Sequence, residues 1–264
     1  MRVLIFGDVV GRPARRAIRD LTPSLIAREG IDLVVANAEN AAGGIGVDVK
    51  SAEDLFASGV DVLTSGNHIW KKREIYSYFS THDHLLRPAN YPEGAPGRGW
   101  LRWEGRTGAR AVIFNVQGRV FMNQVDDPFR CMDRLLREHD RFAPVILVDV
   151  HAEATSEKNA LGWYLDGRVS AVYGTHTHVQ TADERILPKG TGYITDVGMC
   201  GALDSVIGIE KETVIEGFLS QLPRKFAVAE QNVVLQGVIL DVDQVSGKTQ
   251  SIRRVRIPWQ ERLQ

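Results

Sequence analysis

Five short apolar runs in this chain each lead directly into residues that can bind a metal ion or transfer a proton. Runs of this kind, bounded by glycine and polar residues, are typical of buried β-strands. In open α/β sheets, ligands bind beyond the carboxyl ends of the strands, so these side chains are expected to converge on one rim of the sheet. The runs at 2–6, 32–36, 60–64, 145–150 and 169–173 lead into Gly7-Asp8, Asn37-Ala38-Glu39-Asn40, Ser65-Gly66-Asn67-His68, His151 and Gly174-Thr175-His176-Thr177-His178.

Segments with apolar residues at helical spacing separate these runs, which favours an α/β fold with a largely parallel sheet. Pro23 is expected to kink or divide the first helix. Runs at 233–242 and 249–257 are expected to form a hairpin, which indicates a mixed or second sheet. No linker or repeat is visible, so residues 1–264 are expected to form a single domain. The expected helices span 13–29, 51–58, 71–79, 128–139 and 210–221.

The charge of the chain is almost balanced, with 32 Lys and Arg against 33 Asp and Glu. This balance gives no electrostatic reason to expect stable nucleic-acid binding or membrane binding. Two cysteines, Cys131 and Cys200, are too few for a disulfide scaffold and favour a cytoplasmic location. No apolar stretch approaches the ~20 residues of a membrane span. A homo-oligomer, a dimer or larger, is expected for a cytoplasmic enzyme of this size.

Taken singly, the polar residues after the apolar runs have ordinary structural interpretations. Asp8 alone is typical of a turn or helix cap, and His151 alone of a core or surface histidine. His176 and His178 are stronger candidates, because two imidazoles two residues apart on an extended chain point the same way. The joint pattern therefore indicates the site. The remaining histidines are interpreted as surface or loop residues: His82, His84 and His139.

The candidate ligands are carboxylates, amides and imidazoles, without a thiolate, and such a set suits iron, manganese or zinc. There are too many ligands for one tetrahedral site, so two ions fit better, with the Glu39 carboxylate as the natural bridge. Paired ions about 3.5–4 Å apart are a common device for hydrolysing phosphoesters. Such a centre keeps a net positive charge and can stabilise an anionic transition state. His68 is the best available general acid for the leaving group, and Glu153 and Glu157 flank His151 as candidates for supporting contacts.

These residues resemble the motifs of the calcineurin-like metallophosphoesterases. That superfamily carries an Asp at the first strand, a bridging carboxylate at the second, GNH at the third, a later lone His and a GHxH motif. The chain departs from the pattern in three ways. The superfamily's D-x-H is Asp8-Val9-Val10, its GDxxD is replaced by the segment 38–44, and Thr175 is inserted into GHxH.

The departures themselves resemble a narrower family, the bacterial YmdB-like phosphodiesterases, across essentially the whole chain. The segments that carry the resemblance are FGDVVGR, NAENAAGG, SGNHIW, DVHAEATSEK, GTHTHVQTAD and TDVGMCGALDSVIG. The combination is much more specific than any one of these segments. It implies the calcineurin-like metallophosphatase fold, an α/β fold of mixed sheets forming a β-sandwich flanked by helices.

The resemblance also implies an activity: hydrolysis of 2′,3′-cyclic nucleoside monophosphates at the 2′ ester, which leaves a 3′-phosphate. The attack would be in line, by a hydroxide that bridges two iron or manganese ions, and His68 would be the proton donor. Asn40 would replace the ligand lost at Val10. The first ion would be held by Asp8, Glu39, Asn40 and His178, and the second by Glu39, Asn67, His151 and His176.

Other functions are compatible with the residues, and one is the hydrolysis of other phosphoesters at the same binuclear site. Binuclear sites also hydrolyse amides, and ligand type alone does not separate the two reactions. The chain could instead be a metal-binding regulatory scaffold for RNA-processing partners, although the intact ligand set and His68 argue against an inactive enzyme.

Overall fold

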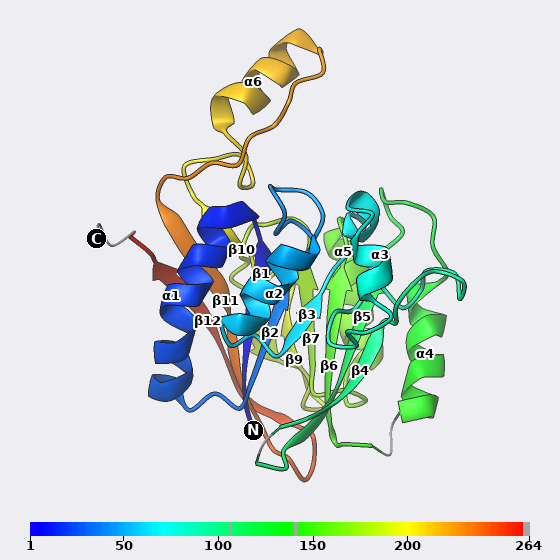
Figure 1. The fold of residues 1–264 in the computed structure, drawn as a ribbon. Helices are drawn as coiled ribbons and strands as arrows, with labels where there is room; N and C mark the ends of the chain where they lie inside the picture. Colours follow the sequence, from blue (N-terminus) through cyan, green and yellow to red (C-terminus); the bar gives the residue numbers. More distant parts are fainter. Residues whose placement is uncertain (106, 140–141, 261–264) are drawn as a thin grey trace.

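The computed structural model describes residues 1–105, 107–139 and 142–260, which form two six-stranded β-sheets with helices around them (Figure 1). The first sheet has the order β12-β11-β10-β1-β2-β3 and the second the order β4-β5-β6-β7-β9-β8. The first sheet contains β1 (Arg2–Val9), β2 (Leu33–Asn37), β3 (Val62–Thr64), β10 (Met199–Ala202), β11 (Val233–Val242) and β12 (Thr249–Pro258). The second contains β4 (Trp100–Glu104), β5 (Arg110–Gln117), β6 (Val145–His151), β7 (Ala171–Thr175), β8 (Arg185–Ile186) and β9 (Gly192–Ile194).

Each sheet has a parallel centre, with antiparallel strands at one edge of the first sheet and at both edges of the second. In the first sheet β1, β2 and β3 run parallel, and β11 and β12 form the expected antiparallel hairpin. In the second sheet β5, β6, β7 and β9 run parallel, and β4 and β8 are antiparallel. The expectation of a mixed or second sheet is therefore confirmed.

The two sheets share one apolar layer. Along β1 the side chains alternate, as they must in a strand. Val3 and Ile5 lie in a buried cluster with residues of the second sheet such as Leu147 and Ala171. Leu4 and Phe6 point the other way, into a cluster with the first two helices. This shared layer holds the carboxyl ends of both parallel centres near one another.

Helices cover the outer face of each sheet. The first two pack on the first sheet through Ala14, Ile18 and Leu55, and the fourth and fifth pack on the second sheet through Met132 and Leu161. The last α-helix has no buried residue and projects from the body of the protein (Figure 1). The helices are α1 (Gly11–Glu29), α2 (Val49–Ala57), the 3-10 helix η1 (Ile69–Lys71), α3 (Ile75–Tyr78), α4 (Pro128–His139), α5 (Thr155–Leu165) and α6 (Lys211–Ser220). No helix within these described residues is long and apolar enough to cross a membrane.

The helices differ from the expected ones in three places. Pro23 does not divide α1, which continues through it as one helix; it lies on the exposed face, where the carbonyl that it leaves unpaired can meet water. The helix expected over 71–79 is divided into η1 and α3, because Lys72 between them is extended, with φ −117° and ψ 114°. The helix α5 was not expected at all.

His139 also differs from its interpretation as a surface or loop residue. It is 4% exposed at the end of α4, with its ring centroid 4.1 Å from that of Trp100. Arg102 Nε donates a hydrogen bond of 3.1 Å to His139 Nδ1. Burial lowers the pKa of His139. The ring therefore acts as an aromatic core residue with one satisfied nitrogen. His82 and His84, in contrast, do lie at the surface.

Candidate metal centre

The candidate site lies where the carboxyl ends of the two parallel centres meet. Asp8 lies near the end of β1, Glu39 follows β2 and His68 follows β3, all in the first sheet. His151 is the last residue of β6, and His176 directly follows β7, both in the second sheet. The five clusters therefore converge as expected, but from two sheets rather than from one.

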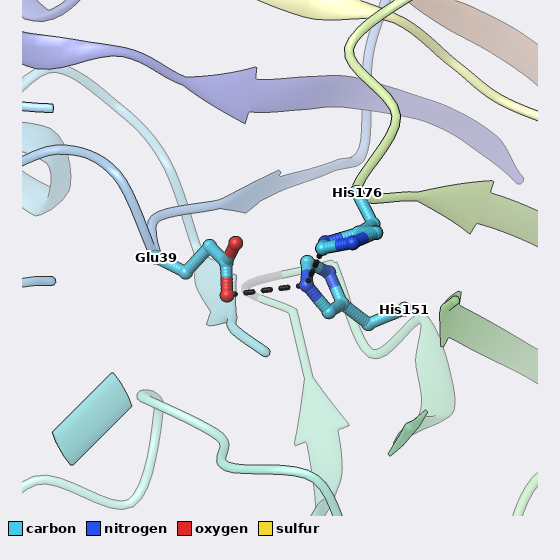
Figure 2. Close-up of side chains that lie close together, drawn as sticks. All are labelled: Glu39, His151 and His176. Atoms are coloured by element: carbon cyan, nitrogen blue, oxygen red, sulfur yellow. Dashed lines mark hydrogen bonds and ion pairs between the residues drawn. The ribbon is translucent and has the colours of Figure 1, made fainter. Parts of the chain in front are cut away.

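His151 is at the centre of the site and is fully buried. Its Nε2 lies 3.1 Å from Glu39 Oε2 and 3.0 Å from His176 Nδ1 (Figure 2), and 3.1 Å from Asn67 Oδ1. A single ring nitrogen carries at most one hydrogen, so it cannot donate to all three neighbours. Glu39, His151 and His176 also offer ligand atoms within 4.8 Å of one another. A cation shared by these atoms would satisfy them together.

Asp8 and His178 face each other beside this cluster. Asp8 Oδ2 accepts a hydrogen bond of 3.0 Å from the His176 backbone N–H, and Asp8 Oδ1 is 3.9 Å from His178 Nε2. His178 Nδ1 lies 2.8 Å from the carbonyl oxygen of Ile207, which requires a hydrogen on Nδ1. The lone pair of the ring is therefore on Nε2, on the side of Asp8. This arrangement is typical of a metal-binding histidine.

Asn40 and His68 complete the predicted set. Asn40 is buried, and its Oδ1 has no hydrogen-bond partner among the described residues. The same holds for Asp8 Oδ1. Buried oxygen atoms without partners are costly, and a metal ion would offset that cost. The His68 backbone N–H donates to Glu39 Oε2 at 3.1 Å, and its ring Nδ1 lies 3.4 Å from Glu39 Oε1.

Burial and neighbouring charges set the ionisation of these groups. Burial raises the pKa of Asp8 well above its usual range. Burial also opposes ionisation of Glu39, but His151 and His68 outweigh it and hold the pKa of Glu39 well below its usual value. Burial lowers the pKa of His176 to about 3 and also lowers the pKa of His178. Both imidazoles are therefore neutral at physiological pH, the form that binds metals.

Side chains behind His151 fix its orientation. Thr175 Oγ1 lies 2.9 Å from His151 Nδ1 and 2.7 Å from Asp149 Oδ1. Asp149 Oδ2 accepts a hydrogen bond from Thr64, and burial raises the pKa of Asp149 to about 6. Sequence reasoning did not single out Asp149 or this contact of Thr175. A carboxylate inside the apolar run of β6 was the signal that could have found Asp149.

The two flanking glutamates have different positions. Glu153 Oε2 lies 3.1 Å from His176 Nε2, so it contacts a proposed ligand as expected. Glu157 does not contact the cluster through any hydrogen bond in the described residues. It accepts hydrogen bonds from the backbone N–H groups of Arg119 and Val120 instead.

The structure thus brings together the residues that the sequence pattern selected. Asn40 follows Glu39 in the chain and is buried, but among the described residues its side chain forms no hydrogen bond to the other site residues. Direct contacts or close ion pairs link the other seven: Asp8, Glu39, Asn67, His68, His151, His176 and His178.

Comparison with known proteins gives consistent matches over nearly the full chain. The sequence signature of the family described as YmdB-like protein matches residues 4–255. The chain is 48% identical to the 2′,3′-cyclic-nucleotide 2′-phosphodiesterase of Bacillus subtilis over 257 residues, which cover 97% of each chain. A hypothetical protein from Thermus thermophilus has a crystal structure with TM-score 0.92 and 46% identity, covering 98% of this chain and 99% of that one. A novel phosphatase from Mycoplasma pneumoniae gives TM-score 0.91 and 36% identity, covering 98% and 93%.

Proposed function

This chain belongs to the YmdB-like protein family, and from that premise we propose that it hydrolyses 2′,3′-cyclic nucleoside monophosphates to 3′-nucleotides. The observation that carries the proposal is the convergence of Glu39, Asn67 and His176 on one nitrogen of His151. The relative from Bacillus subtilis, 48% identical over 97% of the chain, is named for this reaction. The substrate is thus a small phosphodiester that binds at the rim shared by the two sheets.

Two metal ions, iron or manganese, are proposed as the cofactors. The unpartnered Oδ1 atoms of Asp8 and Asn40 support an ion on one side of Glu39, and the convergence at His151 supports an ion on the other. When bound, the ions supply a deprotonated water at neutral pH and neutralise the charge that develops on the phosphoryl oxygens. The residues proposed to hold them are Asp8, Glu39, Asn40 and His178 for the first ion, and Glu39, Asn67, His151 and His176 for the second.

We assign His68 the role of proton donor to the leaving oxygen. Its side chain is 27% exposed, whereas the side chain of Glu39 is 1% exposed and that of His151 is 0% exposed. His68 is therefore at the open side of the cluster, where a substrate can reach it. Its Nδ1 faces Glu39, so its Nε2 is the ring atom available to the substrate. General acids of this kind contribute about 10²–10⁴-fold to the rate.

Water and the cyclic nucleotide are the only reactants that the proposed reaction needs. A water oxygen bonds to phosphorus on the side opposite to the 2′ oxygen, and the bond between phosphorus and the 2′ oxygen breaks. His68 gives its proton to that 2′ oxygen, which leaves as a hydroxyl group. The proton of the attacking water returns to solvent or to His68. The 3′ ester stays intact, so the product is a 3′-nucleotide.

We also propose that the fold is a calcineurin-like β-sandwich and that the chain forms a single domain. The apolar layer between the two sheets supports a calcineurin-like β-sandwich flanked by helices. Pairing of β1 with both β10 and β11 supports one domain over residues 1–264. A cytoplasmic location and a homo-oligomer stay predictions.

The test is hydrolysis of 2′,3′-cyclic AMP by the manganese-loaded protein, with the product identified by chromatography. We expect 3′-AMP from the wild type and a loss of release in both Asn67→Ala and His68→Ala. His68→Ala should keep its bound metal. His82→Ala removes a surface imidazole and is the matched control, with wild-type activity expected. If the wild type binds two metals but releases no 3′-AMP, the substrate is wrong. If His68→Ala loses metal, the role assigned to His68 is wrong.

A further inference from the structure

The turn that carries two of the proposed ligands has an unfavourable backbone conformation. His176 has φ 96° and His178 has φ 62°, and neither is glycine. Left-handed conformations at such residues are uncommon and persist only where the surroundings hold them. Because one histidine is assigned to each metal, whatever holds this turn also sets the positions of both metal sites.

Asp196 is the side chain that holds the turn. It is fully buried, and its Oδ2 accepts hydrogen bonds from the Thr177 backbone N–H at 3.2 Å and from Thr177 Oγ1 at 2.7 Å. Its Oδ1 accepts from the Gly198 N–H at 2.8 Å. Thr177 lies between the two histidines and is thereby attached at both its backbone and its side chain. Rotation of the turn would break both bonds to one carboxylate.

Lys158, from α5, is the counter-ion of this carboxylate. Its Nζ lies 2.8 Å from Asp196 Oδ2, and the residue is 1% exposed. A Cβ atom at Gly174 would lie 2.8 Å from Lys158 Cδ, so the lysine stem passes over a glycine of β7 that leaves room for it. Removing two charges from water is expensive, and losing one partner leaves the other uncompensated. The Lys158 ammonium therefore offsets the cost of burying the carboxylate that accepts from Thr177.

We infer that the buried Lys158–Asp196 pair is a positioning element that holds the His176-Thr177-His178 turn and so sets both metal sites at once. Neither residue is among the proposed ligands, and the pair reaches the turn through the bonds of Asp196 to Thr177. The inference rests on the proposed metal centre. It assigns α5, the helix that the sequence did not predict, a specific role in that centre.

The test measures manganese binding to the metal-free protein by titration calorimetry, together with its thermal unfolding. Lys158→Met keeps the stem and removes the charge, and Thr177→Val keeps the shape and removes the hydroxyl. Both should weaken manganese binding at both sites by about 10–100-fold, the usual effect of losing a partner behind a metal ligand. Thr177→Ser keeps the hydroxyl and should bind like the wild type.

Thr249→Val is the control for a merely structural effect. The hydroxyl of Thr249 is buried and donates a 2.6 Å hydrogen bond to the Ser170 carbonyl oxygen, without contact to the turn. This variant should unfold at a lower temperature yet bind manganese with wild-type affinity. If Lys158→Met and Thr177→Val behave in the same way as Thr249→Val, the inference is overturned. Should Lys158→Met fail to fold, the pair Thr177→Val and Thr177→Ser decides the question alone.

The outcomes separate this inference from the proposed function. A wild-type protein that binds no manganese or iron would overturn the metal centre, and the inference with it. A wild-type protein that binds two ions, together with variants that bind them equally well, would overturn only the positioning role. Weaker binding in both variants, with wild-type binding in Thr177→Ser, supports both.

Discussion

The two sheets contribute different chemistry to the same rim. The first sheet contributes oxygen donors, and the second contributes imidazoles; in Figure 2, Glu39 faces His151 and His176 from the opposite side. Neither sheet alone offers all of the proposed ligands, so the candidate site depends on the shared apolar layer that holds the two carboxyl edges together. The oxygen donors are Asp8, Glu39, Asn40 and Asn67, and the imidazoles are His151, His176 and His178.

The two sets of groups are also held in different ways. The carboxylates of Asp8 and Glu39 accept hydrogen bonds from backbone N–H groups, those of His176 and His68. In the second sheet, the side chain of Thr175 orients His151 and that of Glu153 contacts His176, whereas His178 bonds to the Ile207 backbone carbonyl. His151 and His176 therefore depend on positions at which a single substitution can remove the support, whereas the carboxylates depend on the course of the backbone.

The largest effect is expected from removing the imidazole at the centre. His151→Ala removes the atom on which the first sheet's Glu39 and Asn67 converge. It should abolish detectable phosphodiesterase activity and lower the metal content, because a proposed ligand of the second ion is lost. Metal analysis measures the ion content, and hydrolysis of 2′,3′-cyclic AMP measures the activity. Full metal content in His151→Ala would contradict the assignment of His151 as a ligand of the second ion.

A smaller effect is expected at Thr175, which contacts the proposed ligand His151 and is not itself a proposed ligand. Thr175→Val removes the hydroxyl that bridges His151 and Asp149, while the volume of the side chain is kept. Manganese affinity and turnover should fall by about 10–100-fold, because the His151 ring loses the contact that orients it. Calorimetry and steady-state kinetics check this. Wild-type affinity in this variant would contradict the idea that side chains behind the imidazoles orient them.

The smallest effect on turnover is expected from a substitution in the apolar layer between the sheets. Leu240→Ala removes a fully buried side chain of that layer, far along the chain from any proposed ligand. The free energy of unfolding should fall by about 2–5 kcal/mol in urea titrations. Turnover per folded, metal-loaded molecule should stay unchanged. A large loss of turnover in the folded variant would mean that packing between the sheets tunes the site as well as holding it together.

Much of the fold was visible in the sequence, because buried strands form continuous apolar runs. The division into two sheets was not, since a strand such as β6 has the same apolar pattern whichever sheet it joins. The helix α5 was missed because its apolar residues have no clear helical spacing and it contains Gly162. A larger residue does not fit at that position, because a Cβ atom there would lie 2.5 Å from the Tyr193 ring.

The candidate site was more predictable than its supports. Residues such as Glu39 and His176 stand out because polar groups directly after apolar strands are unusual in combination. Lys158 and Asp196 give no such signal, because their pairing joins a helix and a loop 38 residues apart in the chain. The sequence pattern can therefore indicate which groups meet a ligand, but the structure is needed to show what holds them.

The most direct test of the account is the metal content of the wild type and of Glu39→Gln after loading with manganese or iron. Glu39 is proposed to bind both ions, and the amide keeps its shape while losing the charge and one of the two donor oxygens. We expect two ions per wild-type chain and fewer than one in Glu39→Gln. Two ions retained in Glu39→Gln, or a single ion in the wild type, would contradict a two-metal centre shared through this carboxylate.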